Sequence, residues 1–220
     1  MNGDAPGFFG KLPARADFLT RGLSMSFTEP WHAWLVRGLQ FAAEALAAGF
    51  EPAYMAAPVW RFVIPPGACG PLPAAGILMP SVDKVGRRFP LTLAVVSASL
   101  TTPLAMVAAS SWFDALEETG RDALARDPDI DVWAERLADV VPALPSVMPP
   151  DGVHVPLAES GVESAVLPAL AAYGAEQAVL FWCEGSPFVQ PCALVTPDLP
   201  DGAWFTRLLC DPASSEENAP

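Results

Sequence analysis

The sequence predicts an α/β protein, a layered α/β/α sandwich built on a mixed, largely antiparallel sheet. Helical and strand patterns interleave along the 220 residues without forming a regular βαβ repeat. A run of strands precedes two helices, and strands then return, which favours antiparallel pairs with helices on both faces. Hydrophobic residues make up 52% of the chain and charged residues only 17%, so a large core is available.

The first half of the chain predicts one long helix and three strands. Tryptophan and leucine recur on one helical face over residues 30–48, which predicts the helix. Apolar and β-branched runs bounded by proline and glycine predict strands at 59–64, 76–80 and 90–98. The uncharged stretch 89–113 is long enough to span a bilayer. Its serines and threonines favour instead a strand followed by a helix that starts at Thr102–Pro103.

That next helix is expected over residues 103–126. Glu117 precedes Arg121 and Asp122 precedes Arg126 by four positions, a spacing typical of ion pairs on a solvated helix face. We therefore expect Glu117, together with its neighbour Glu118, on the exposed side of this helix.

The remaining elements are shorter. A third helix is expected to start at Asp129 or Asp131, and prolines between 142 and 150 predict an irregular connection. A helix at 161–173, strands at 178–183 and 191–196, and a short helix at 203–210 follow. We expect residues 1–210 to form a single domain and 211–220 a disordered acidic tail.

Charge excludes several classes of function. The net charge is -13, so a protein that binds a long nucleic-acid track is disfavoured. The balance is uneven, with a net +2 over residues 1–90 and -15 over 91–220. No run of lysine and arginine predicts membrane-surface binding, and the N-terminus lacks the pattern of a secretory signal, so we expect a cytoplasmic protein with no membrane insertion.

No motif predicts catalysis. The sequence contains neither GxxxxGK[ST], GxGxxG nor GxSxG, and only His32 and His154 could act as a histidine base. Both are expected at the surface. The four cysteines lack CxxC spacing and are expected to be free thiols. We therefore predict no catalytic residue, no metal and no cofactor, and a protein that is not an enzyme.

Charged side chains concentrate in two apolar blocks, FFGKLPARADFLTRGL and SVDKVGRRFPLT. The candidate partner-binding residues from these blocks and the neighbouring strand are Lys11, Arg15, Asp17, Arg21, Arg61, Ser81, Asp83, Arg87 and Arg88. Two interpretations stay open. The charges could pair with one another inside the fold, because burying them unpaired is costly. They could instead form a surface where arginine and aromatic residues meet a protein partner.

Four sequence blocks carry a family resemblance. FFGKLPARADFLTRGL, EPWHAWL, APVWRFVIPPGACG and GILMPSVDKVGRRFPLTLA resemble, in order and spacing, the N-terminal domain of TagF, also called ImpM, from bacterial type VI secretion. Two positions depart from the family pattern, Ala16 where glycine is expected and His32 where aspartate is expected. The second departure removes a carboxylate that could pair with an arginine.

The resemblance implies a function that the residues alone do not. It implies a cytoplasmic, post-translational repressor of type VI secretion that binds the forkhead-associated scaffold protein of that apparatus. It also implies a possible link to the pathway of a PppA-type phosphatase. Two alternatives stay open: a protein or enzyme that binds a small anionic ligand through its lysine and arginine side chains, and a structural accessory subunit. The basic first half and the acidic segment 114–139 are both candidate docking faces.

Overall fold

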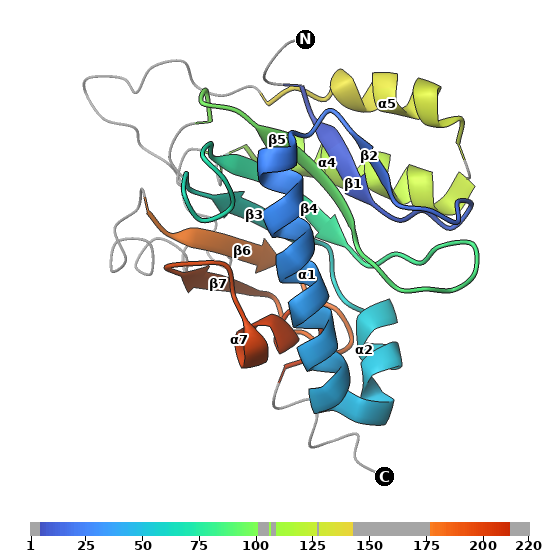
Figure 1. Cartoon of the computed structure of the whole chain (residues 1–220), viewed down its shortest axis with the longest axis vertical. Coiled ribbons are helices and arrows are strands. Elements are labelled where there is room, and N and C mark those ends of the chain that lie inside the picture. Colours follow the sequence, from blue (N-terminus) through green and yellow to red (C-terminus); the bar gives the residue numbers. More distant parts are fainter. Residues whose placement is uncertain (1–4, 101–105, 107–108, 127, 143–176, 212–220) are drawn as a thin grey trace.

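Seven strands form one sheet in this computed structural model, which describes residues 5–100, 106, 109–126, 128–142 and 177–211. The strands are β1 (Gly7–Gly10), β2 (Leu19–Arg21), β3 (Trp60–Ile64), β4 (Ala74–Met79), β5 (Leu91–Val96), β6 (Val179–Cys183) and β7 (Cys192–Thr196). Their order is β2-β1-β5-β4-β3-β6-β7 (Figure 1). Every pairing among these strands is antiparallel, so the predicted α/β class and largely antiparallel sheet are confirmed.

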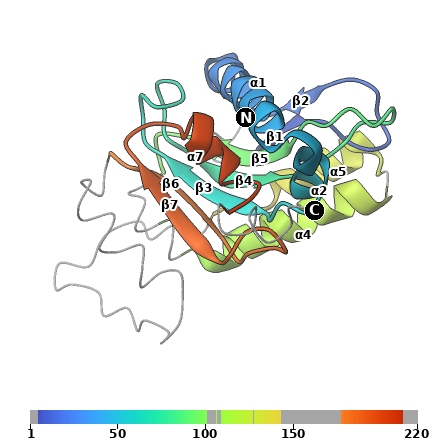
Figure 2. The same ribbon diagram turned by 90° about the horizontal axis from the view of Figure 1, so that it is seen from below.

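Helices cover both faces of the sheet (Figure 2). They are α1 (Met25–Leu46), the 3-10 turn η1 (Ala47–Gly49), α2 (Phe50–Met55), α4 (Ser110–Arg126), α5 (Ile130–Ala138) and α7 (Gly202–Thr206). The buried side chains divide into two clusters, one between the sheet and α1, α2 and α7, the other between the sheet and α4 and α5. The fold is therefore the three-layer sandwich that the sequence predicts.

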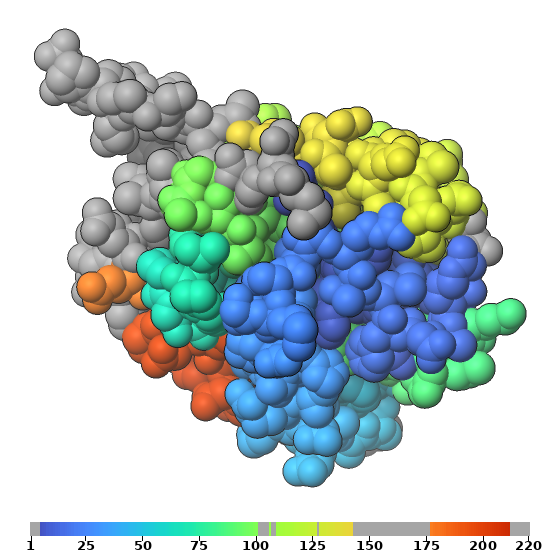
Figure 3. Space-filling view, turned by 45° about the horizontal axis from the view of Figure 1, so that its top comes forward, coloured from blue at the N-terminus to red at the C-terminus, as the bar shows by residue number. Residues whose placement is uncertain are grey.

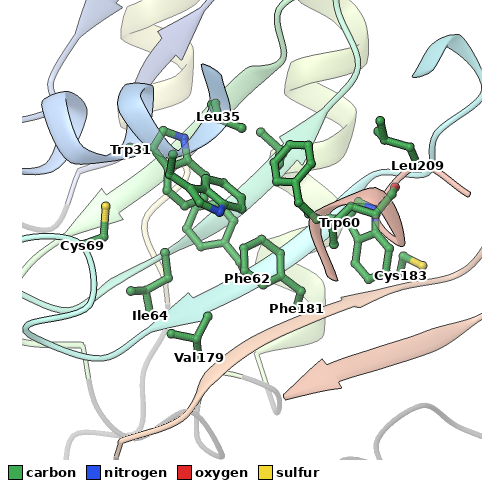
Figure 4. Packing of buried hydrophobic residues seen from close by; sticks show 14 of the residues in the cluster. Trp31, Leu35, Trp60, Phe62, Ile64, Cys69, Val179, Phe181, Cys183 and Leu209 are labelled. Atoms are coloured by element: carbon green, nitrogen blue, oxygen red, sulfur yellow. The ribbon is translucent and has the colours of Figure 1, made fainter. Parts of the chain in front are cut away.

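Aromatic rings fill the core beneath α1 (Figure 4). The ring of Trp31 lies 4.9 Å from that of Phe62 and 6.5 Å from that of Phe181, measured between centroids. Its indole N–H donates to the Thr92 hydroxyl at 2.8 Å, which satisfies a polar group that burial would otherwise leave costly.

Two other tryptophans fix the end of the chain to this core. The indole N–H of Trp34 donates to the Pro200 carbonyl at 2.6 Å, and that of Trp60 to the Leu208 carbonyl at 2.8 Å. Helix α7 also lies directly on α1 at Gly38, where a Cβ atom would lie 2.2 Å from the Phe205 ring. Only glycine allows this close approach.

On the opposite face, α5 begins at a single capping residue. The Asp129 carboxylate accepts hydrogen bonds from the backbone N–H groups of Asp131, at 2.9 Å, and Val132, at 3.2 Å. Of the two helix starts that the sequence allows, Asp129 is the one used.

The predicted strands and the observed strands agree at five places, but the first 60 residues contain elements that were not predicted. The strands β1 and β2 have four and three residues, too few to show an alternating pattern. Helix α1 begins at Met25, five residues before the predicted start, and carries Pro30 inside it. The sequence predicts that this helix ends at residue 48, but the chain stays helical through η1 and directly into α2.

Several predictions fall outside the described residues. They are the helix start at Thr102–Pro103, the connection beyond Pro142, the helix at 161–173 and the tail from 212 to 220. Asp211, the first residue of the expected tail, is described: its backbone N–H donates to the Phe188 carbonyl at 2.8 Å, and its carboxylate accepts from the Gln190 N–H at 2.6 Å. None of the helices in the described ranges is both long and apolar enough to cross a membrane.

Candidate functional site

Two loops lie side by side at one end of the sheet, and we call residues 11–18 and 81–88 together the basic corner (Figure 1). The first loop joins β1 to β2, and the second joins β4 to β5. The Lys84 backbone N–H donates to the Arg15 carbonyl at 3.0 Å, and the Arg87 guanidinium donates to the Ala16 carbonyl at 2.5 Å. The structure thus brings together two of the sequence blocks that carry the candidate residues.

The Asp83 carboxylate is the centre of the basic corner. One of its oxygens accepts from the Lys11 ammonium at 2.7 Å and from the Arg87 Nε at 2.6 Å. The other accepts from the backbone N–H groups of Val85, at 3.0 Å, and Arg87, at 2.9 Å. Burial alone would raise the pKa of Asp83, but these donors outweigh it and hold that pKa well below its usual range. Lys11 and Asp83 are thus a buried ion pair.

Helix α2 anchors the same corner through a residue that the sequence analysis missed. The Tyr54 hydroxyl donates to the Ser81 carbonyl at 2.7 Å and accepts from the Ser81 N–H at 3.1 Å. The Ser81 hydroxyl in turn donates to the Lys11 carbonyl at 2.7 Å. Burial raises the pKa of Tyr54, so its hydroxyl keeps its proton. Nothing in the sequence around Tyr54 signals this contact, because α2 itself was not predicted.

Residues 81–89 form a hairpin that projects from the sheet. Its backbone pairs Ser81 with Phe89 and Asp83 with Arg87, and Gly86 closes the tip at a φ of 85°, a conformation that favours glycine. Lys84 and Val85 form the rest of the tip, and Val85 is 68% exposed. Figure 3 shows this green tip extending beyond the blue surface of the first loop. Gly86, in a polar stretch between two predicted strands, is the feature of the sequence that could have predicted this hairpin.

An aromatic depression of about 300 Å³ borders the basic corner. Its lining includes Phe9, Phe18 and His32. The His32 ring lies edge-on to Phe18 at 5.4 Å, and the Lys11 ammonium lies 5.0 Å from the centre of the Phe18 ring. Phe18 is 46% exposed, so this depression offers apolar surface beside the charged tip. His32, the residue that departs from the family pattern, packs here against aromatic rings.

Arg61 lies elsewhere, between β3 and α4. Its Nε donates to Glu117 at 2.8 Å, and its Nη2 donates to Asp114 at 2.7 Å. Glu117 is 7% exposed, so the expectation that it lies on a solvated face was wrong. The cause is Arg61 itself, which draws this carboxylate against the sheet. The predicted pair with Arg121 also forms, at 2.7 Å, through the other oxygen of Glu117.

The other candidate residues point in separate directions. Arg88 pairs with Glu51 of α2, and Arg21 pairs with Asp131 of α5 at 2.5 Å on the surface. Asp17 is exposed in the first loop of the basic corner. The candidate cations therefore do not converge on one anion site, since most of them already contact a carboxylate.

The described residues offer little for catalysis. His32 lies among aromatic rings, and His154 falls outside the described part of the chain. Among the described residues, no group of three histidine, cysteine or acidic side chains could hold a metal ion. The basic corner and its aromatic depression place exposed charge beside exposed apolar surface.

Comparisons with known proteins cover the whole of this corner. A family model described as the TagF N-terminal domain, type VI secretion system-associated, matches residues 7–140. Among solved structures, the chain is similar to PA0076 from Pseudomonas aeruginosa PAO1, with 32% sequence identity, a TM-score of 0.76 and coverage of 94% of each chain. A comparison with curated proteins finds no match.

Proposed function

The chain belongs to the TagF N-terminal domain family, associated with type VI secretion, and from this premise we propose that it represses that secretion by binding another protein. The proposed partner is the forkhead-associated scaffold protein of the apparatus. Binding would take place in the cytoplasm, and the repression would be post-translational. The action needs no catalysis, and a PppA-type phosphatase would belong to the same regulatory pathway. The observation that carries the proposal is the projecting, internally anchored basic corner.

The charge of the basic corner is opposite to that of the chain as a whole. Residues 11–18 and 81–88 contain five cations and two carboxylates, in a chain of net charge -13. Such a local reversal attracts an acidic partner surface and orients it before contact. The neighbouring Phe18 supplies apolar area of the kind that dominates binding energy at interfaces.

The anchoring of the tip also supports binding. Asp83, Ser81 and Tyr54 hold the hairpin through buried hydrogen bonds, so little conformational freedom remains to be lost when a partner docks. On the acidic α4–α5 side, Asp122 is paired with Arg126 at 3.2 Å and Arg136 at 2.9 Å, whereas Lys84 at the tip of the basic corner is exposed and makes no ion pair with a described residue. We therefore favour the basic corner over the acidic face as the docking surface.

The structure identifies which substitutions test this proposal cleanly. Arg87 and Glu117 are poor choices, because each is part of a buried network. Lys84 is exposed at the tip and makes no ion pair with any described residue, so Lys84→Glu reverses charge without disturbing the fold. Arg37→Glu, at an exposed position of α1, makes the same charge change away from the corner and is the matched control.

The experiment is calorimetric titration of the purified scaffold protein with the unaltered chain and with both variants. We expect binding by the unaltered chain, at least about tenfold weaker binding by Lys84→Glu, and a change of less than about twofold for Arg37→Glu. Equal weakening by both variants would contradict the assignment to this corner.

Failure of the unaltered chain to bind would overturn the scaffold proposal, and two further measurements then separate the alternatives. A rise in Tm with a phosphorylated metabolite would support an anionic ligand, since a ligand that binds only the folded state stabilises it. Stoichiometric co-purification with assembled secretion particles would support a structural subunit.

A further inference from the structure

Two of the four cysteines face each other at one end of the sheet. Cys183 is the last residue of β6, Cys192 is the first residue of β7, and the two are register partners in the antiparallel ladder. Both side chains pack on the side of the sheet that α1 and α7 cover, where Figure 4 shows Cys183 with Phe181 and Trp60. The two thiols are neighbours, and each affects the pKa of the other.

This arrangement meets the geometric requirement for a disulfide. Partner residues in an antiparallel ladder have Cα atoms about 4.5–5.5 Å apart. Disulfides join residues whose Cα atoms are about 4.4–6.8 Å apart. Register partners in a ladder also carry their side chains on the same face of the sheet, so both sulfur atoms lie on one side of it. Cys69 and Cys210 lie outside the strands and have no such partner.

The two thiols differ in reactivity. The hydrogen bond from Cys192 lowers the pKa of Cys183 against the effect of burial, with help from the backbone N–H groups of Gly185 and Cys192. The same hydrogen bond raises the pKa of Cys192. The lowered pKa favours the thiolate form at Cys183, which is the form that attacks an oxidant, and leaves Cys192 as the thiol that can resolve the product. Cys69 is unlike both, since burial raises its pKa to about 12.

Small oxidants have a short route to the pair. Cys192 is partly exposed, and β7 is an edge strand among the described strands of the sheet. Cys183 itself is 1% exposed, so access of a molecule of the size of hydrogen peroxide depends on the partly exposed Cys192 beside it, at the hairpin end of β6 and β7.

We propose that Cys183 and Cys192 form a reactive dithiol that a hydroperoxide oxidises to an intramolecular disulfide. The Cys183 thiolate attacks one peroxide oxygen, the O–O bond breaks, and Cys183 becomes a sulfenic acid while the other oxygen leaves as hydroxide or alkoxide. The Cys192 sulfur then attacks the Cys183 sulfur. The S–S bond forms, the S–O bond breaks, and the oxygen leaves as water with the Cys192 proton. The dithiol loses two electrons, and the peroxide gains them.

The disulfide would close a short ring around the β6–β7 turn. That turn already holds Asp211, through the Phe188 carbonyl and the Gln190 N–H. Oxidation would therefore stabilise the attachment of the segment that follows α7, because a crosslink reduces the freedom of the unfolded chain.

The test is peptide mapping of the full chain after treatment with hydrogen peroxide and alkylation of the remaining thiols. Cleavage after Glu184 and Arg207 separates Cys183, Cys192 and Cys210 onto three peptides. We expect the peptides that carry Cys183 and Cys192 to remain joined until a reductant is added, in a monomeric chain whose Tm rises by several degrees.

Variants distinguish this pair from general oxidation. Cys192→Ser should abolish the crosslink and leave a sulfenic acid at Cys183 that dimedone traps, whereas Cys69→Ala and Cys210→Ala should leave the crosslink intact. Circular dichroism identifies any variant that fails to fold, and the unaltered chain still gives the mapping result. Four alkylated cysteines after peroxide treatment, or a crosslink that involves Cys69, Cys210 or a second chain, would overturn the proposal.

Discussion

Lys11 and Arg61 are both buried cations next to core strands, but their surroundings differ. Lys11 pairs with Asp83, whose side chain is fully buried, and the pair joins two loops that are 72 residues apart in sequence. Arg61 contacts Asp114 and Glu184, whose side chains are 64% and 85% exposed, besides the buried Glu117. We call the network around Lys11 closed because its shared carboxylate, Asp83, is fully buried. We call the network around Arg61 open because water reaches two of its three carboxylates.

This difference separates two uses of the same residue types. The closed network around Asp83 gives a surface hairpin a fixed shape. The open network around Arg61 holds helix α4 to strand β3. Its carboxylates can still contact water or Arg121 if Arg61 is lost. A buried ion pair that loses one partner is strongly destabilised, whereas a pair in contact with water can be partly compensated.

The largest effect is expected for Asp83→Asn. This change leaves the Lys11 ammonium buried without its counter-ion and puts an amide NH2, which is a donor, in place of one of the two carboxylate oxygens that accept hydrogen bonds. We expect Tm, followed by circular dichroism, to fall by roughly 10 °C. Asp17→Asn, at an exposed position in the same corner, should change Tm by less than about 2 °C. Similar shifts in the two variants would show that the network is not closed.

A smaller effect is expected for Arg61→Met. Glu117 keeps Arg121 as a partner, and Asp114 keeps its contact with water, so part of the lost interaction is replaced. We expect the free energy of unfolding in urea to fall by about 2 kcal/mol. Arg121→Met, which removes a largely exposed cation from the same carboxylate, should cost less than about 1 kcal/mol. A loss for Arg61→Met as large as that for Asp83→Asn would remove the distinction between the networks.

The comparison also predicts a pH dependence. The pKa of Asp83 is lower in the folded state than its ordinary value of 3.8, so its stabilising contribution is complete above about pH 4 and is lost as the pH falls through the folded pKa. Between pH 4 and pH 2, the urea midpoint of the unaltered chain should fall more steeply than that of Asp83→Asn. An equal fall in the urea midpoint of the two proteins would contradict the assignment of this pH dependence to Asp83.

The smallest effect on stability is expected at the tip of the hairpin. Lys84→Ala should change the free energy of unfolding by less than about 0.5 kcal/mol, because Lys84 is exposed and makes no ion pair with a described residue. The same variant should weaken binding to the scaffold protein in the calorimetric titration. If Lys84→Ala lowered both the free energy of unfolding and the affinity for the scaffold protein, Lys84 would support the hairpin instead of contacting a partner.

The sequence predicted the parts of the fold that depend on long local patterns. The strands β3 to β7 were predicted because each is a run of apolar residues, and proline adjoins or begins all of these runs except that of β6. The short β1 and β2 were missed because they become strands only by pairing, β1 with β5 and β2 with β1. The partner of β1 lies more than 80 residues away in the sequence, and β2 forms only against β1, so no local pattern shows either strand.

The candidate site was predicted only in part, because its contacts also join residues that are far apart in the sequence. The sequence made Lys11, Ser81 and Asp83 candidates but left ion pairing and partner binding as open alternatives. The structure shows that pairing holds for these residues, and that Lys84, Val85 and Phe18 present the exposed surface. The support from Tyr54 depends on a helix that no sequence signal predicted.

The tryptophans of the α1 face have a consequence for how the chain folds as it is synthesised. Their indole groups at Trp34 and Trp60 bond to carbonyls at Pro200 and Leu208, and strand β3 is covered on one edge by β6. Translation from the end of β5 to Leu208 takes on the order of ten seconds. During that interval the newly made sheet has an uncovered strand edge and unbonded indole groups. The nascent chain therefore passes through a period in which a chaperone, or a second nascent chain, can compete for this surface.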